Sequence, residues 1–202
     1  DEDEEIKDLD LQTLTNLSKF PGLMKQIMKN PDLWHKIKND YADPDISNKK
    51  RGVLSTLFNN AAKSNYNVEN MINNDKDGMK ALLNKMINDP VKSLDDGGRE
   101  IAETEVDTLC NILKDRNNYK AFSKGDLLNE DDINKLENLY KDLDPKIGEP
   151  LKPIIEQIRE ADKAKKEKDD VEEDEKKLLE LEKRVGNCFE NHKRALLKYA
   201  SK

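Results

Sequence analysis

Apolar residues recur along this chain at the three- and four-residue spacing of amphipathic helices. Breaks that contain proline separate the apolar stretches, as at Pro21-Gly22, Asn30-Pro31 and Asp43-Pro44. We therefore expect an all-α protein. The expected helices cover residues 4–19, 23–28, 31–41, 47–63, 66–73, 79–87, 99–115, 133–140 and 150–166, with a further helix at the C-terminus.

One short phrase, two apolar residues followed by an asparagine, lies near the end of three expected helices. The three asparagines are 43 and 52 residues apart. Recurrence at roughly 40 residues is typical of helical solenoids, in which stacked units share one continuous core. The pattern therefore favours a binding surface over a catalytic pocket. The three copies read Leu11-x-x-Leu14-x-Asn16, Leu54-x-x-Leu57-x-Asn59 and Val106-x-x-Leu109-x-Asn111.

The unit from Leu54 to Met86 is the most regular: it carries the phrase, then a polar run, then Gly78 between two expected helices. In this order of features the chain resembles the armadillo repeat, and the resemblance covers roughly residues 4–165. The resemblance implies an armadillo-like right-handed alpha solenoid, with a C-terminal capping helix from Pro150. The residues that carry it are Leu54 to Ala62, Asn67, Met71, Ile72, Gly78, Leu82 and Leu83, then Leu109, Asn111, Asn117, Phe122, Gly125, Leu136 and Leu139, and in the first unit Leu14, Asn16, Ile27 and Ile37.

The expected domains are the armadillo-like repeats with their cap, residues 1–168, and a C-terminal amphipathic helix, residues 169–202. The 52-residue step requires an insertion, which we expect in the loop at 92–98. The chain begins at Asp1 within an acidic run, and we expect it to be a C-terminal part of a longer armadillo-repeat protein.

Apolar residues of the C-terminal helix alternate at spacings of three and four, which is the heptad seam of a coiled coil or of a helix docked on a partner. This coiled-coil-like extension could dimerise, dock back on the repeats or continue as a longer helix of the parent protein. The seam consists of Leu178, Leu181, Val185, Cys188, His192, Ala195 and Tyr199.

In armadillo proteins the equivalent asparagine faces a concave groove, and its amide both donates and accepts hydrogen bonds. The resemblance therefore implies that Asn16, Asn59 and Asn111 form a ladder that binds the backbone of an extended peptide. The alternative is that the three asparagines bond to neighbouring groups and tie adjacent units together.

Charged residues reach 39% of the chain with both signs mixed, so the net charge is only −7. No strongly basic face is apparent, which argues against a nucleic-acid partner. No run of about 20 apolar residues exists, which argues against a membrane span. The two cysteines, Cys110 and Cys188, lack a Cys-x-x-Cys motif, so we expect no zinc site, no disulfide framework and a cytoplasmic location.

Other candidate chemistry is weak. The stretch from Asn73 to Gly78 is similar to the start of a calcium loop, but Asn84 stands where such a loop needs a bidentate glutamate. His35 and His192 are far apart in the sequence, and no phosphate-binding loop or catalytic set stands out. We expect no enzyme activity and no cofactor.

The sequence therefore favours a non-enzymatic scaffold or adaptor that binds a protein segment along a groove, in a setting such as the cytoskeleton. Three alternatives stay open. One is a regulatory domain that resembles the GTPase-binding region of formins, and a second is an armadillo-type chaperone cofactor. The third is a structural module of a larger assembly. Self-association through the C-terminal helix accompanies the first of these.

Overall fold

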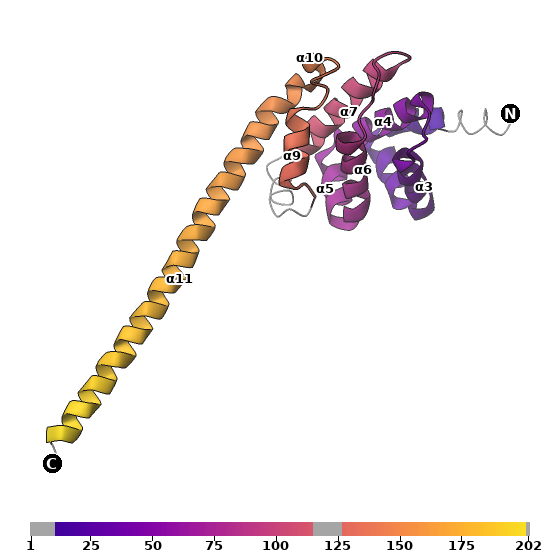
Figure 1. The fold of residues 1–202 in the computed structure, drawn as a ribbon. Helices are drawn as coiled ribbons and strands as arrows, with labels where there is room; N and C mark the ends of the chain where they lie inside the picture. Colours follow the sequence, from indigo (N-terminus) through magenta and orange to yellow (C-terminus); the bar gives the residue numbers. More distant parts are fainter. Residues whose placement is uncertain (1–10, 115–126, 201–202) are drawn as a thin grey trace. The chain divides into compact units, whose positions relative to one another are not determined.

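The computed structural model describes the backbone of residues 11–114 and 127–200, and their side chains except those of 162, 165, 192 and 195–200. The described backbone is helical and contains no strand, which confirms the all-α prediction for these stretches (Figure 1). Residues 11–18 are helical, and the further elements are α2 (Pro21–Lys29), α3 (Pro31–Ala42), α4 (Asn48–Ala62), α5 (Asn65–Asn74), α6 (Lys76–Asn88), α7 (Gly98–Leu113), α9 (Glu130–Glu137), α10 (Pro145–Gly148), the 3-10 helix η1 (Glu149–Leu151) and α11 (Lys152–Ala200).

The chain divides into two compact units, Asp1–Ile158 and Arg159–Lys202, so the division falls inside α11. The sequence placed this boundary at residue 168. Asn117, Phe122 and Gly125, which carry part of the expected last repeat, lie outside the described residues. None of the described helices is both long and apolar enough to cross a membrane.

Side-chain caps explain where several helices begin. Asn30 Oδ1 accepts a hydrogen bond from the Leu33 amide at 3.2 Å, and Pro31 occupies the first turn of α3, as predicted. A capping box begins α9, because Asn129 and Asp132 accept each other's backbone amides at 2.9 and 3.0 Å.

Within the first compact unit, Asp1–Ile158, corresponding helices of the expected repeats pack side by side. The medium helices α3, α6 and α9 form one row, and the long helices α4 and α7 pack most extensively of all. Thr15 Oγ1 donates to the Val53 carbonyl at 3.3 Å and so links the helical residues 11–18 to α4. One continuous apolar core runs through these rows, from Met24 to Ile158 at the beginning of α11.

Two glycines are required by close approaches around α6 and α7. A Cβ at Gly98 would overlap the Ser93 carbonyl of the loop that precedes α7, the loop in which the sequence predicted an insertion. Gly78 lies in the first turn of α6 rather than between two helices, which corrects the expectation from the repeat resemblance. A Cβ at Gly78 would collide with the side chains of Asp75 and Lys38.

Asp75 ties α3 to the beginning of α6. Its carboxylate caps α6 by accepting from the Gly78 amide at 3.2 Å. The same carboxylate accepts from Trp34 Nε1 at 2.8 Å and from Lys38 Nζ at 2.6 Å. Trp34 is buried, and its indole N–H is satisfied by the bond to Asp75.

A buried ion pair joins α4 to α7. Arg51 donates from Nε and Nη2 to the two oxygens of Glu105, at 2.7 and 2.9 Å, and the two side chains are 7% and 1% exposed. The Tyr41 hydroxyl and Ser55 Oγ donate to the same carboxylate at 2.7 and 3.1 Å. Arg51 Nη2 also donates to the Asp89 carbonyl at 2.9 Å. These bonds satisfy both charges, without which their burial would be costly.

Helix α11 is continuous where the sequence predicted a capping helix and a separate C-terminal helix. Neither glycine nor proline occurs between Pro153 and Gly186, so nothing in this stretch breaks the helix. Charged pairs one turn apart also support it, such as Lys177 with Glu173 at 2.9 Å.

We predict that Arg51→Met lowers the free energy of unfolding by about 3–5 kcal/mol, because it leaves the Glu105 carboxylate buried without a cation. The double variant Arg51→Met, Glu105→Leu should recover most of this loss. Urea denaturation measures both. Lys50→Met is the control, since the Lys50–Asp40 pair is more exposed and should contribute at most about 1 kcal/mol. Equal losses in the single and double variants would contradict the ion pair's role.

A second prediction concerns alkaline pH. Burial, and then the Glu105 charge, raise the pKa of Tyr41 well above its ordinary value near 10. The unfolded chain releases this proton more readily, so stability from Tyr41 is complete below about pH 10 and is lost as pH rises further. Stability measured by urea denaturation should therefore fall less steeply above pH 10 in Tyr41→Phe than in the wild type. Equal slopes would contradict this prediction.

Candidate functional site

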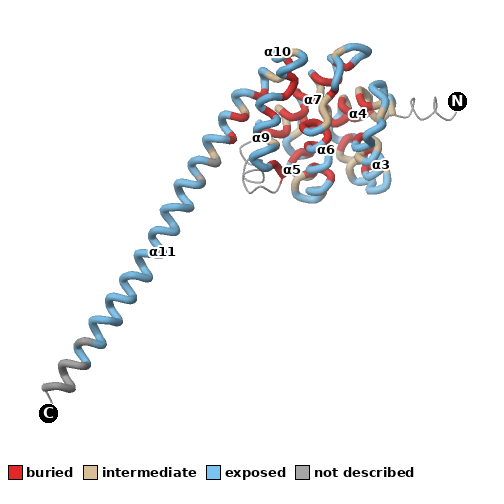
Figure 2. Tube along the Cα trace, viewed as in Figure 1, coloured by how far each residue is buried: buried red, intermediate tan, exposed pale blue. Residues whose placement is uncertain are grey.

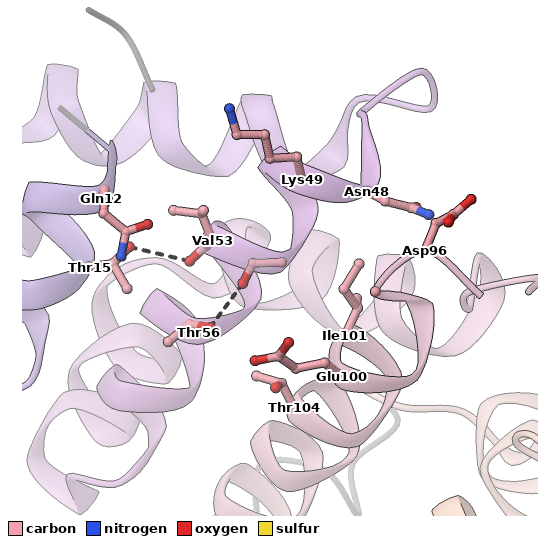
Figure 3. Close-up of a pocket in the computed structure, with 12 residues that line it drawn as sticks. Gln12, Thr15, Asn48, Lys49, Val53, Thr56, Asp96, Glu100, Ile101 and Thr104 are labelled. Carbon is pink, nitrogen blue, oxygen red and sulfur yellow. Dashed lines mark hydrogen bonds between the residues drawn. The ribbon is translucent and has the colours of Figure 1, made fainter. Parts of the chain in front are cut away.

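A groove with a volume of about 460 Å³ runs across three helical segments of the first unit (Figure 3). We call it the polar groove. The helical residues 11–18, α4 and the beginning of α7 each supply part of its lining. The lining residues are Gln12, Thr15, Asn48, Lys49, Gly52, Val53, Thr56, Asp96, Gly97, Glu100, Ile101 and Thr104.

The floor of the polar groove is formed where α4 and α7 approach each other. Gly52 and Val53 are half-buried and Ile101 is buried. A Cβ at Gly52 would lie 3.4 Å from Ile101 Cγ1. Because Gly52 has no side chain, the space between the two helices stays open above Ile101. The floor is therefore apolar, and it rests on the most extensive helix pair of the fold.

The rim of the polar groove is polar and carries both signs of charge. Asp96 and Glu100 are exposed on the α7 side, and Lys49 is exposed on the α4 side (Figure 3). Thr56 and Thr104 lie half-buried between the rim and the floor, and Thr56 Oγ1 donates to the Gly52 carbonyl at 2.9 Å. Amide, hydroxyl and charged groups of this kind can pair with the backbone and side chains of a bound segment.

The structure brings two of the three predicted asparagines together. Asn111 Nδ2 donates to Asn59 Oδ1 at 3.2 Å, which links the ends of α7 and α4. Asn111 Oδ1 also accepts from Lys114 Nζ at 2.7 Å. Asn16 is exposed and accepts from Lys19 Nζ at 3.2 Å within its own helix. Asn59 and Asn111 thus bond between α4 and α7, and the role of all three in peptide binding stays a prediction.

The polar groove and the asparagine pair lie on the same helices. Thr56 precedes Asn59 by three residues, and Thr104 precedes Asn111 by seven, which are about one and two helical turns. The sequence analysis predicted the asparagines but not the groove residues. The recurrence of small and hydroxyl-bearing residues before each asparagine, as at Gly52 and Thr56, could have indicated them.

A further contact between helices was missed from the sequence. Asn60 Nδ2 donates to Ser18 Oγ at 3.0 Å, which joins α4 to the helical residues 11–18. Ser18 Oγ donates in turn to the Thr15 carbonyl at 2.6 Å. The doubled asparagine at 59 and 60 was a usable signal, because it places one amide toward each neighbouring helix.

Both cysteines are free thiols. Burial, and then the Asp107 charge, raise the pKa of Cys110 to about 11, so its thiol is protonated at neutral pH and is a poor nucleophile. Cys188 is exposed on α11. Among the described residues, no group of three or more histidine, cysteine, aspartate or glutamate side chains could hold a metal ion.

The predicted C-terminal seam lies on an exposed part of α11 (Figure 2). Leu178, Leu181 and Val185 are 61%, 57% and 62% exposed. The side chains of His192, Ala195 and Tyr199 lie outside the described residues. The described part of the seam is therefore an apolar stripe that the second unit itself does not cover.

Comparison of the chain with protein-family models, with curated proteins and with solved structures finds no match. The function must therefore be inferred from the residues of the polar groove and of α11.

We predict that the Asn59–Asn111 bond couples α4 to α7 by about 0.5–1.5 kcal/mol. A double-mutant cycle with Asn59→Ala and Asn111→Ala, measured by urea denaturation, gives this energy. The matched control is the cycle of Asn16→Ala with Asn111→Ala, which should be additive. Additivity in both cycles would show that the Asn59–Asn111 bond does not contribute.

Proposed function

We propose that the chain is a non-enzymatic protein-interaction module, and that its first unit binds an extended segment of a partner protein along the polar groove. One observation carries the proposal: three helical segments, residues 11–18, α4 and α7 with the loop before it, present amide, hydroxyl and charged side chains to a single groove. A surface repeated along a helix array suits a repetitive ligand, and an extended polypeptide is such a ligand.

An extended segment exposes backbone amides and carbonyls that must find partners when they leave water. Gln12 and Asn48 can both donate and accept at the rim, and Thr104 can do so closer to the floor. The Thr56 hydroxyl donates to the Gly52 carbonyl and can still accept from a bound segment. The apolar floor at Val53 and Ile101 accommodates one small apolar side chain of the segment. We expect backbone pairing to supply affinity and this position to supply part of the selectivity.

The charges of the rim indicate which charge a bound segment should carry. Asp96 and Glu100 are exposed carboxylates within one turn of each other, at the end of the groove where α7 begins. A lysine or arginine of the bound segment would pair with them, and it would raise the association rate. We therefore propose that the segment carries at least one basic residue toward α7.

This proposal draws on the armadillo resemblance of the sequence and on the packing of α3 with α6, of α6 with α9 and of α4 with α7. In such an array the long helices line the binding face, which is where the polar groove lies. The role that follows is that of a cytoplasmic scaffold or adaptor, with the cytoskeleton as one setting.

The proposal is tested by selecting peptides from a random displayed library on the immobilised full chain, followed by titration of the enriched peptides. The enriched sequences should carry basic residues. Glu100→Lys should weaken their binding at least about tenfold, because it replaces attraction by repulsion at the rim. Glu103→Lys is the matched control, since Glu103 lies on α7 outside the groove and pairs with Arg99 at 3.6 Å.

A selection that yields no peptide, or peptides whose affinity Glu100→Lys and Glu103→Lys reduce equally, would overturn the assignment of the polar groove. The variants should first be shown to unfold at the same urea concentration as the wild type.

A further inference from the structure

The second unit carries an apolar stripe along α11 that has the spacing of a coiled-coil seam. Val171, Leu178, Leu181 and Val185 are each more than half exposed. Their separations of seven, three and four residues place them on one face of the helix. Cys188, also exposed, extends the same stripe by one further position. Exposure of such an apolar stripe to water is unfavourable, and burial against another helix lowers the free energy.

The part of the stripe from Leu178 to Cys188 is symmetric about one point of the sequence. Leu178 and Cys188 lie equally far from Lys183, and so do Leu181 and Val185. A helix that pairs with a reversed copy of itself therefore places apolar residues opposite apolar residues on both sides of this point.

The charges change sign at the same point. Residues 169–182 contain eight carboxylates and two lysines, whereas residues 183–194 contain four basic residues and one glutamate. The charged side chains of this stretch are exposed, and their ion pairs within the helix, such as Lys193 with Glu190 at 3.9 Å, are on the surface. Within residues 169–194, each half of the stretch is thus complementary in charge to the other half and not to itself.

We propose that a second copy of this chain covers the stripe, with the two α11 helices antiparallel and crossing near Lys183. Leu178 then packs against Cys188 of the second copy, and Leu181 packs against its Val185. The acidic half of each helix lies beside the basic half of the other.

A parallel pair would have the opposite electrostatics. In register, it would place the acidic residues 169–175 beside the same residues of the second copy, which is repulsive. The two arrangements therefore differ in their response to salt, because screening weakens the antiparallel pair and strengthens the parallel one. This proposal concerns α11 alone, so it can fail while the polar groove still binds a peptide, and the reverse also holds.

Sedimentation equilibrium of the full reduced chain tests the association. The wild type should form a dimer whose dissociation constant rises with salt. Leu181→Asp should raise that constant at least about 100-fold, because two leucines of each dimer lose their burial. Leu179→Asp is the matched control, since Leu179 is similarly exposed, at 55%, but lies one position off the stripe. A wild type that stays monomeric up to about 100 μM, or equal effects of the two variants, would overturn the proposal.

Disulfide formation tests the orientation. In the antiparallel pair the two Cys188 residues lie about 15 Å apart along the axis, too far for a disulfide. Oxidised wild-type chain should therefore stay non-covalent, whereas Leu178→Cys should yield a covalent dimer through the introduced thiol and Cys188. Leu179→Cys, with its thiol off the stripe, should yield much less. Covalent dimers of the wild type through Cys188 would indicate a parallel pair and overturn the antiparallel assignment.

Discussion

The ion pair between Arg51 and Glu105 is the interaction on which the first unit depends. It has two parallel hydrogen bonds of 2.7 and 2.9 Å, so it fixes how α4 lies along α7 and not merely that the helices touch. The Tyr41 hydroxyl brings α3 to the same carboxylate, and the Asp89 carbonyl brings in the end of α6. A buried pair of this kind is a weak source of stability but a strong constraint on alternative packings, because any shift would leave a charge unpaired.

The polar groove follows from that constraint. Gly52 follows Arg51 directly, and Ile101 precedes Glu105 by one helical turn, so the floor of the groove is built from residues adjacent to the ion pair. The asparagine pair fixes the other ends of α4 and α7, through the 3.2 Å bond between Asn111 and Asn59. The groove is therefore held at both ends, and its shape is formed before any segment binds. Preformed sites of this kind lose little conformational entropy on binding.

The two units expose different kinds of surface. In the first unit, apolar side chains are buried in the core, and the surface across α4 and α7 presents hydrogen-bonding groups. In the second, none of the described side chains beyond Ile158 is buried, and the described apolar residues Val171, Leu178, Leu181 and Val185 are exposed between charged residues. The first arrangement suits an extended polypeptide, and the second suits another amphipathic helix.

Much of the helical framework could be predicted from apolar spacing and from breaks at proline, because those signals act over a few residues. The caps at Asn30 and Asn129 were predictable for the same reason. The ion pair was not, since Arg51 and Glu105 are 54 residues apart and charged residues on an amphipathic helix are ordinarily exposed. The continuity of α11 was missed because the resemblance implied that a capping helix ends the repeats, whereas the sequence contains neither glycine nor proline between Pro153 and Gly186 to end that helix.

The most direct test of the account is hydrogen exchange of the full chain, alone and with a peptide selected on it. In the free chain, the amides of α4 and α7 should exchange more slowly than those of α2, because the ion pair and the core hold them. Bound peptide should add protection at the beginnings of α4 and α7, where the polar groove lies. Protection confined to α11, or rapid exchange of α4 and α7 in the free chain, would contradict a preformed groove as the binding surface.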